Sequence, residues 1–383
     1  MTSGAPGAPA AAPTPGPRTV LVVGAGLVGT SVALALRRAG ERVLLDDRDR
    51  ARRDLAVALD AGEAWAGERV DHAVVAVPPS VVPVVLAGLQ QREVAATYTD
   101  CASVKSTPQR EVESSGMDAG SFCGGHPIAG RERSGPAAAR DDLFVGRAWV
   151  LTPTEETRWE ALEQARATAL ACGASVTVMA PQAHDRALAR VSHVPQLVAS
   201  LLAARLLDDA EGAAGLAGQG MRDTTRIAGS DPALWADIVA RNAGPVAAVL
   251  DELRHDLDRL RDALDPARSG RAGDDTPLRD AVTDLLRRGN EGRARLPGKH
   301  GGLASPFAVV PVVVADEPGT LARLFSDCAA TGISVEDLHL EHATGRPRGV
   351  AELLVQPEHA VRLAERLAER GWSVHLPAGG ATV

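Results

Sequence analysis

The sequence has 383 residues, of which 45% are hydrophobic and 23% charged, which is typical of a globular chain and long enough for two or three domains. Its formal net charge of -8 offers no long-range attraction to nucleic acid or to an anionic membrane, so small molecules are the expected partners. The four cysteines, at positions 101, 123, 172 and 328, are too widely spaced for a zinc knuckle or a disulfide scaffold and suit a reducing cytoplasm.

Residues 1–18 consist mainly of Ala, Pro, Gly and Thr. They lack the apolar core of a secretory signal, so they are predicted to form a disordered tail. No later apolar run is expected to be long enough to cross a bilayer.

A β-branched run from Thr19 to Val23 is followed by a glycine-rich turn and then by a helical pattern over 31–39. This order predicts the strand, tight turn and helix that open a dinucleotide-binding domain. The first glycine allows the turn, the second lets a pyrophosphate approach the backbone, and the third permits close packing of helix on strand. The predicted cofactor-binding residues of this turn are Gly24, Gly26, Leu27, Val28 and Gly29.

A second predicted strand, 42–45, ends in Asp46 and Asp47. A carboxylate at this position accepts hydrogen bonds from both ribose hydroxyls of NAD and repels the extra phosphate of NADP. Arg48 follows directly and would soften that preference. The pattern therefore favours NAD over NADP.

Several further strands are predicted to end at one edge of the same sheet. Strand 70–77 stops at Pro78, a strand ending at residue 100 leads into Ser103, and the short segment 121–122 leads to His126. Because the carboxyl ends of parallel strands meet at the ligand-binding edge of a doubly wound sheet, we expect these residues to converge on one crevice. Two later strands, with a helix between them, complete a predicted Rossmann-like domain over residues 19–180.

His126 lies between glycines and a proline, in a stretch that continues through Glu132 and Ser134. Neither a helix nor a regular strand is expected there. An imidazole on a stiff loop can exchange protons near neutral pH, so His126 is the candidate catalytic base. A turn histidine that only hydrogen-bonds its neighbours is the alternative from this stretch alone.

The hydrophobic period then becomes helical and predicts a second, all-helical domain over residues 181–265. At about 100° per residue, His193 and Gln196 share a face while His184 points nearly opposite. One straight helix therefore cannot aim all three at one ligand. Pro195 is expected to bend this helix.

Further along, Arg222 and Arg226 stand at i and i+4 on one basic helical face. Arg222 is interpreted as solvated, whereas Arg226, next to the apolar Ile227, is the better candidate for binding an anion. Asp231 and Pro232 then predict the start of another helix, which continues to about residue 264.

Residues 266–305 are rich in Gly, Arg, Asp and Pro and are predicted to be a linker with one short helix, 278–288. The patterns in 306–383 follow the order strand, helix, strand, strand, helix, strand, which predicts a ferredoxin-like βαββαβ domain. The predicted fold class is thus α/β at the N-terminus, all-helical in the middle and βαββαβ at the C-terminus.

These segments together resemble the prephenate dehydrogenase family of the bacterial tyrosine pathway, in the form that carries a C-terminal ACT domain. The resemblance runs from residue 19 to the end. It rests on Trp235 and on six blocks in order, 24–29, 100–105, 125–130, 184–185, 192–195 and 222–228. It implies a homodimer formed through the helical domain, and an active site between that domain and the nucleotide-binding domain.

The resemblance implies an NAD-dependent oxidative decarboxylation. A ring hydroxyl is deprotonated, hydride passes to the nicotinamide, and carbon dioxide leaves as the ring becomes aromatic, with no metal needed. By the family pattern His126 takes the hydroxyl proton, and Ser103 holds that histidine and the cofactor in place. Arg226 would pair with the ring carboxylate, and His193 would line the pocket.

The same pattern makes Asp47 the expected ribose ligand, with Asp46 as the fallback. Pro78, at its predicted strand end, joins the cofactor-binding residues. The chain departs from many relatives at Gln196, where they have a histidine that would face the substrate side chain. A neutral amide would weaken attraction for prephenate and tolerate arogenate. Prephenate is favoured as the commoner substrate, and arogenate is the alternative.

Similarity to ACT domains implies an effector site for tyrosine or another amino acid near residues 316–319 and 332–333. The alternative is a domain that only dimerises.

Two other classes of function compete with the dehydrogenase. A non-catalytic NAD-sensing regulator would need no ionisable group beside the nicotinamide, and the grouping of Ser103, His126 and Arg226 argues against it. A hydroxy-acid or sugar-acid dehydrogenase would use a base, typically lysine, on the helical domain, and residues 181–265 contain no lysine.

Overall fold

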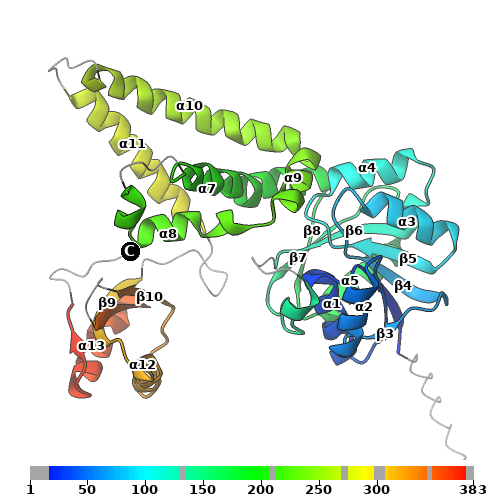
Figure 1. Cartoon of the computed structure of the whole chain (residues 1–383), viewed down its shortest axis with the longest axis horizontal. Helices are drawn as coiled ribbons and strands as arrows, with labels where there is room; N and C mark the ends of the chain where they lie inside the picture. Colours follow the sequence, from blue (N-terminus) through cyan, green and yellow to red (C-terminus); the bar gives the residue numbers. More distant parts are fainter. Residues whose placement is uncertain are drawn as a thin grey trace, which may run out of the picture. The chain divides into compact units, whose positions relative to one another are not determined.

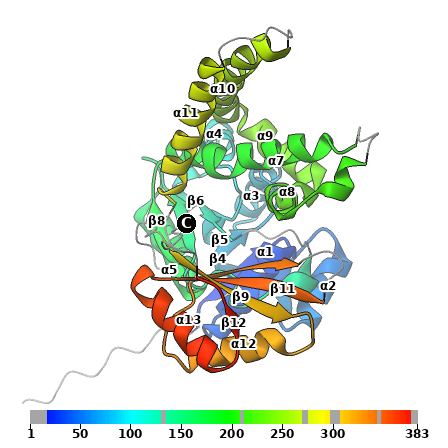
Figure 2. The same cartoon turned by 90° about the vertical axis from the view of Figure 1, so that its left-hand side faces the viewer.

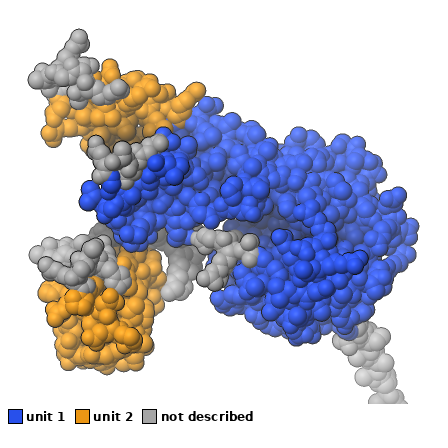
Figure 3. All heavy atoms as spheres, in the orientation of Figure 1, with its two compact units in different colours: residues 1–253 blue, residues 254–383 orange. Residues whose placement is uncertain are grey.

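The computed structural model describes residues 17–129, 135–207, 212–268, 275–296, 307–342 and 347–376. The chain divides into two compact units, residues 1–253 and 254–383, which Figure 3 shows in separate colours. The predicted tail up to residue 16 lies outside the described residues, as do Glu132 and Ser134.

The first unit contains a mixed sheet of eight strands within the described residues, in the order β3-β2-β1-β4-β5-β6-β7-β8. Neighbouring strands in this order are parallel except β6 and β7. The order reverses between β1 and β4, which is where doubly wound sheets bind ligands. The strands are β1 (Thr19–Val23), β2 (Arg42–Asp46), β3 (Glu63–Ala64), β4 (Val70–Val75), β5 (Ala95–Asp100), β6 (Phe122–Pro127), β7 (Ala148–Thr152) and β8 (Ser175–Val178).

Helices cover both faces of this sheet (Figure 1). Side chains alternate along a strand, so Val20 and Val22 of β1 are buried in one core cluster while Leu21 and Val23 are buried in another. The first cluster includes residues of α1, α2 and α5, and the second includes residues of α3 and α4. The predicted Rossmann-like domain is confirmed. Its helices are α1 (Leu27–Arg38), α2 (Arg50–Ala58), α3 (Val82–Gln91), α4 (Ser106–Ser114) and α5 (Trp159–Ala171).

His126 lies in strand β6, so the prediction of an irregular loop was wrong. It pairs with Val150 of the antiparallel neighbour β7. Gly125 has poor strand propensity, but only glycine fits there, because a Cβ atom would lie 2.7 Å from the carbonyl oxygen of Asp100. Close packing between β5 and β7 therefore overrides the local preference of the sequence.

The helical segment differs from the prediction in two places. Helices α6 (Pro181–Leu188) and α7 (Val194–Ala204) are joined by a π-helical turn, Ala189–His193. The predicted single helix from Asp231 is interrupted at Asn242. The later helices of the segment are α8 (Gln219–Thr225), α9 (Pro232–Arg241) and α10 (Ala243–Arg268), seen in Figure 1.

By length and composition, the stretch Pro181–Ala204 could cross a membrane, contrary to the expectation from the sequence. One such helix is weak support for a membrane span. Three of its polar residues, His184, Asp185 and His193, are buried and hydrogen-bonded inside the first unit. Such contacts indicate a core helix of a globular unit.

The second unit contains α11 (Thr276–Arg293), which extends beyond the predicted short helix of the linker. Arg288 of α11 forms an ion pair with Asp256 at 2.8 Å, so this part of the linker is held to α10. The neighbouring linker residues 269–274 and 297–306 lie outside the described part.

The C-terminal sheet has the strand order β10-β11-β9-β12, and each neighbouring pair is antiparallel. Helices α12 and α13 lie on one face of it (Figure 2), where their apolar residues join the strands in one core cluster. This is the predicted βαββαβ topology. The elements are β9 (Ala308–Ala315), α12 (Thr320–Ala329), β10 (Asp337–His342), β11 (Arg348–Val355), α13 (Ala360–Glu369) and β12 (Ser373–Val374).

The turn between β1 and α1 generates a stability prediction. Gly24 has a positive φ of 105°, and a Cβ atom on Gly29 would lie 1.8 Å from the carbonyl oxygen of Gly24. We expect Gly29→Ala to lower the free energy of unfolding in urea by about 3 kcal/mol, because neither backbone segment can move away. Gly26→Ala is the matched control, since no atom lies within 4 Å of its added Cβ. Equal stability of the two variants would contradict this account.

Candidate active site

The ends of β5 and β6 are joined by a buried ion pair. Asp100 and Lys105, 0% and 2% exposed, form this pair, with Lys105 Nζ hydrogen-bonded to the Asp100 carboxylate. Lys105 Nζ also donates to the carbonyl oxygen of Gly125 at 2.7 Å, and the amide of Gly125 donates to Asp100 at 2.9 Å. The pair thus holds both sides of the residue that precedes His126.

His126 is the first member of a hydrogen-bonded chain that leads into the helical segment. Its Nδ1 lies 2.9 Å from Nε2 of His184, and Nδ1 of His184 lies 2.8 Å from Oδ1 of Asp185. Asp185 also accepts hydrogen bonds from the backbone amides of Lys105 and Ser106, at 2.9 and 2.8 Å. The α6 residues therefore contact both the predicted base and the start of α4.

The π-helical turn explains why His184 reaches the same site as His193. In a straight α-helix the two side chains would point in nearly opposite directions. A π turn absorbs about one extra residue and rotates the following residues back by roughly 100°, which leaves these two within about 80° of each other. Pro195 lacks the amide that would continue an α-helical ladder, and it stands in the first turn of α7.

His193 is 1% exposed and its ring packs against Trp235, with ring centroids 6.1 Å apart. The Nδ2 amide of Asn242 donates to the carbonyl oxygen of Asp185 and lies 2.9 Å from Nδ1 of His193. An amide nitrogen can only donate, so Nδ1 of His193 accepts and the proton of the neutral ring sits on Nε2. That Nε2 is buried and has no hydrogen-bond partner among the described residues. It is a buried donor without an acceptor among those residues.

These histidines are neutral at physiological pH. Burial, followed by the nearby His184, holds the pKa of His126 well below its ordinary value. Burial lowers the pKa of His193 to about 4 and also lowers that of His184, which its hydrogen bond to Asp185 offsets only in part. A neutral imidazole has one nitrogen free to accept a proton, as a general base requires.

The predicted cofactor residues lie together at the switch point of the sheet. Those of the glycine turn occupy the end of β1 and the first turn of α1. Asp47 follows β2, and its carboxylate accepts from the amides of Ala25 and Asp49 at 2.6 and 2.8 Å. Space is open beside Gly26, and Pro78 is exposed beyond the end of β4. The arrangement has room for a pyrophosphate at the start of α1 and a carboxylate beside it.

The remaining predicted site residues are less tightly connected. Ser103 is half-buried after β5, and no hydrogen bond between described residues joins its hydroxyl to His126. Arg226 is exposed in the 3₁₀ turn Arg226–Gly229. Gln196 is buried and donates to the carbonyl oxygen of Ile227 at 2.9 Å. The Gln196 side chain therefore holds the turn that carries Arg226.

Five residues of the hydrogen-bonded network are not among the predicted site residues: Asp100, Lys105, His184, Asp185 and Asn242. Lys105 carried an available signal, because it and Lys299 are the only lysines among 41 basic residues. For Asn242 the signal is absent, because its role depends on the helix break.

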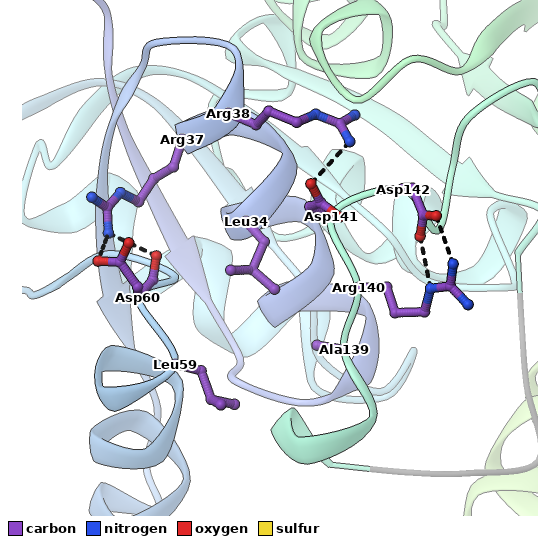
Figure 4. A pocket seen from close by; sticks show the side chains of 9 residues that line it. All are labelled: Leu34, Arg37, Arg38, Leu59, Asp60, Ala139, Arg140, Asp141 and Asp142. Atoms are coloured by element: carbon purple, nitrogen blue, oxygen red, sulfur yellow. Dashed lines mark hydrogen bonds and ion pairs between the residues drawn. The ribbon is translucent and has the colours of Figure 1, made fainter.

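A charged hollow of about 560 Å³ on the surface of the first unit is not this site (Figure 4). None of the predicted site residues lines it. Its three arginines are paired with carboxylates, in the pairs Arg37 with Asp60, Arg38 with Asp141 and Arg140 with Asp142. Paired guanidinium groups offer little to an anionic ligand.

Among curated relatives, the chain is similar to "Probable prephenate dehydrogenase NovF" of Streptomyces niveus, with 38% identity over 93% of this chain and 99% of the relative. Among solved structures, it is similar to prephenate dehydrogenase from A. aeolicus in complex with hydroxyphenyl propionate and NAD+. The TM-score is 0.62 and the identity 29%, over 72% of this chain and 98% of that one. Arogenate dehydrogenase of Synechocystis gives a TM-score of 0.57 and 30% identity over the same shares.

Two family models match the chain in succession. The model described as prephenate dehydrogenase, nucleotide-binding domain, matches residues 32–178, and the one described as prephenate dehydrogenase, dimerization domain, matches residues 180–273. The chain belongs to the prephenate dehydrogenase family.

Proposed function

We propose that this protein is an NAD-dependent prephenate dehydrogenase, which converts prephenate into 4-hydroxyphenylpyruvate and carbon dioxide. The observation that carries the proposal is the neutral imidazole of His126, held at the ligand-binding edge of a dinucleotide-binding sheet by Lys105 and Asp100. The family match and the NAD+ complex of the A. aeolicus relative support the cofactor.

His126 acts as the general base for the ring hydroxyl. Its free nitrogen takes the hydroxyl proton while hydride leaves the carbon that bears this hydroxyl. The bond to the ring carboxylate then breaks, carbon dioxide departs, and its electron pair completes the aromatic ring. Ser103, which follows β5, is proposed to orient the base and the cofactor once substrate and NAD are bound. When bound, NAD supplies the acceptor for the hydride.

The NAD site consists of the glycine turn, Asp47 and Pro78. Open space beside Gly26 fits close approach of a pyrophosphate, and the amides at the start of α1 favour its negative charge. The Asp47 carboxylate beside the turn receives the ribose hydroxyls. The residues of the turn are Gly24, Gly26, Leu27, Val28 and Gly29.

The substrate carboxylate pairs with Arg226, whose guanidinium suits two parallel hydrogen bonds. His193 offers its neutral Nε2 donor to an oxygen of the substrate. Gln196 acts on the substrate through the turn Arg226–Gly229. Arogenate is the second candidate substrate, favoured by the neutral amide at Gln196 and by the similarity to the Synechocystis arogenate dehydrogenase.

Residues 306–383 of the second unit are proposed to be an ACT-like regulatory domain, supported by their βαββαβ topology. This domain has a hollow of about 490 Å³, lined in part by Glu317, Gly319 and Arg323. The hollow includes part of the predicted effector stretch 316–319 but not residues 332–333. The Arg323 guanidinium stacks on Trp372, 4.6 Å from its ring centroid. Arg323 also forms an ion pair with Asp327 at 3.8 Å, and Arg348 brings a second guanidinium to the hollow. Together with Glu317 these groups match the two charges of a free amino acid such as tyrosine.

We keep the predicted domain limits, 19–180, 181–265, 266–305 and 306–383, as part of this proposal. The family match to a dimerization domain supports a homodimer through the helical segment, as do Leu207 and Leu216, which are 86% and 88% exposed there. Four free, buried cysteines support a reducing compartment such as the cytoplasm.

Steady-state assays of prephenate and arogenate, each with NAD and NADP, test the function. We expect prephenate with NAD to give the highest kcat/KM. His126→Asn should lower kcat by roughly 100-fold, because the base is lost while NAD affinity, measured by titration, stays unchanged. Absence of cofactor reduction with either substrate would remove the enzyme proposal, and near-normal turnover of the variant would remove the base assignment.

The pH dependence of kcat/KM follows from the lowered pKa of His126. The unprotonated ring is the active form, so acid inactivates the enzyme. Because this pKa lies well below 6.5, kcat/KM should stay level from about pH 8 down through 6.5 and decline only at more acid pH. A decline centred at 6.5 or above would show that burial does not control the base. His126→Asn serves as control, since its residual activity should lack this decline.

Tyrosine added to the same assay tests the regulatory domain. We expect inhibition of about 5-fold or more, the lower end of ordinary allosteric coupling. Arg323→Met removes the guanidinium from the hollow and should abolish inhibition without changing the basal rate. No effect of tyrosine on rate or on thermal unfolding would leave dimerisation as the role of this unit.

A further inference from the structure

We propose that Asp185 and His184 set the tautomer of His126, so that its Nε2 carries the free electron pair, and that they stabilise the ring once it takes the substrate proton. The inference rests on the proposed function. Both are positioning residues, since they act through His126.

The direction of the hydrogen bonds follows from Asp185. A carboxylate only accepts, and both its oxygens also receive backbone amides, from Lys105 and Ser106. Burial raises the pKa of Asp185, but its hydrogen bonds, first that from His184, bring it below the ordinary value. The group is therefore ionised, and Nδ1 of His184 must be the donor across the 2.8 Å contact.

The same logic passes on to His126. Burial keeps His184 neutral, so a ring that carries its proton on Nδ1 has a free electron pair on Nε2. That Nε2 accepts from Nδ1 of His126 across 2.9 Å. The remaining nitrogen of His126 is then unprotonated. A lone histidine would populate both tautomers, and only one of them has the base on the side away from His184.

The chain also acts after proton transfer. The new positive charge on His126 lies one imidazole away from the Asp185 carboxylate, to which His184 is hydrogen-bonded. The charge of Lys105 opposes it but is paired with Asp100. Four other residues of this network are at most 2% exposed, namely Asp100, Lys105, His184 and Asp185. Water therefore screens their electrostatic interactions with His126 only a little. A carboxylate joined through a neutral ring thus favours the protonated base when it forms.

Two substitutions at position 184 separate this role from packing. His184→Gln can place an amide oxygen near the former Nε2 and still accept from His126. His184→Phe keeps an aromatic ring for the edge contact with His126, whose ring centroid lies 5.1 Å from that of His184 in the parent. The phenyl ring cannot accept the hydrogen bond from His126. We expect kcat to fall less than 10-fold in His184→Gln and about 100-fold in His184→Phe, with NAD affinity close to that of the parent in both. His184→Phe should also unfold at a lower temperature, because the buried Asp185 loses a hydrogen-bond donor.

The readout specific to the tautomer is a long-range ¹H–¹⁵N NMR spectrum of the histidine rings. His126 should carry its proton on Nδ1 in the parent and in His184→Gln, and show mixed tautomers in His184→Phe. Equal or higher kcat in His184→Phe than in His184→Gln, or a parent His126 protonated on Nε2, would overturn the inference. Failure of the proposed function can be told apart from failure of this inference. If the proposed function is wrong, the parent reduces no NAD, while the tautomer of His126 can still be assigned by NMR.

Discussion

The site depends on one carboxylate. Asp185 lies on the first helix of the helical segment and accepts hydrogen bonds from the backbone amides of Lys105 and Ser106. These two residues are the N-cap and the first residue of α4 in the sheet domain. Asp185 therefore caps a helix of one domain from a helix of the other, where the helix dipole favours negative charge. Through His184 it also reaches His126. The same group thus contributes both to the placement of the two domains and to the orientation of the base.

A member of this buried network that loses its partner destabilises the fold. Breaking a buried ion pair such as Asp100 with Lys105 costs about 3 to 5 kcal/mol, because the remaining charge is left without a partner. Replacing both members with apolar groups would avoid that cost, but would also release Gly125, which the pair holds by its amide and its carbonyl. The polar core is therefore explained by the position of His126 in β6 and not by stability.

Much of this arrangement could be predicted from the sequence. A β-branched run identified β1, the glycines identified the turn, and strand ends identified the edge at which His126 lies. The strand character of β6 could not be predicted, because Gly124, Gly125 and Pro127 disfavour a strand and only close packing enforces it. Nor could the π turn or the break at Asn242, since each depends on contacts between segments far apart in the chain.

The lowered pKa of His126 has opposite effects on catalysis. It keeps the ring unprotonated at neutral pH, so every molecule has an active base, but a weak base gains little from the proton it removes. Aromatisation of the ring makes the proposed reaction favourable, so proton transfer need not be. The hydrogen-bonded link to Asp185 through His184 compensates for the low basicity of His126, because it stabilises the positive charge as that charge forms. A buried base in this setting needs a carboxylate close enough to stabilise its protonated form, yet separated by one neutral ring, so that it does not hold the proton beforehand.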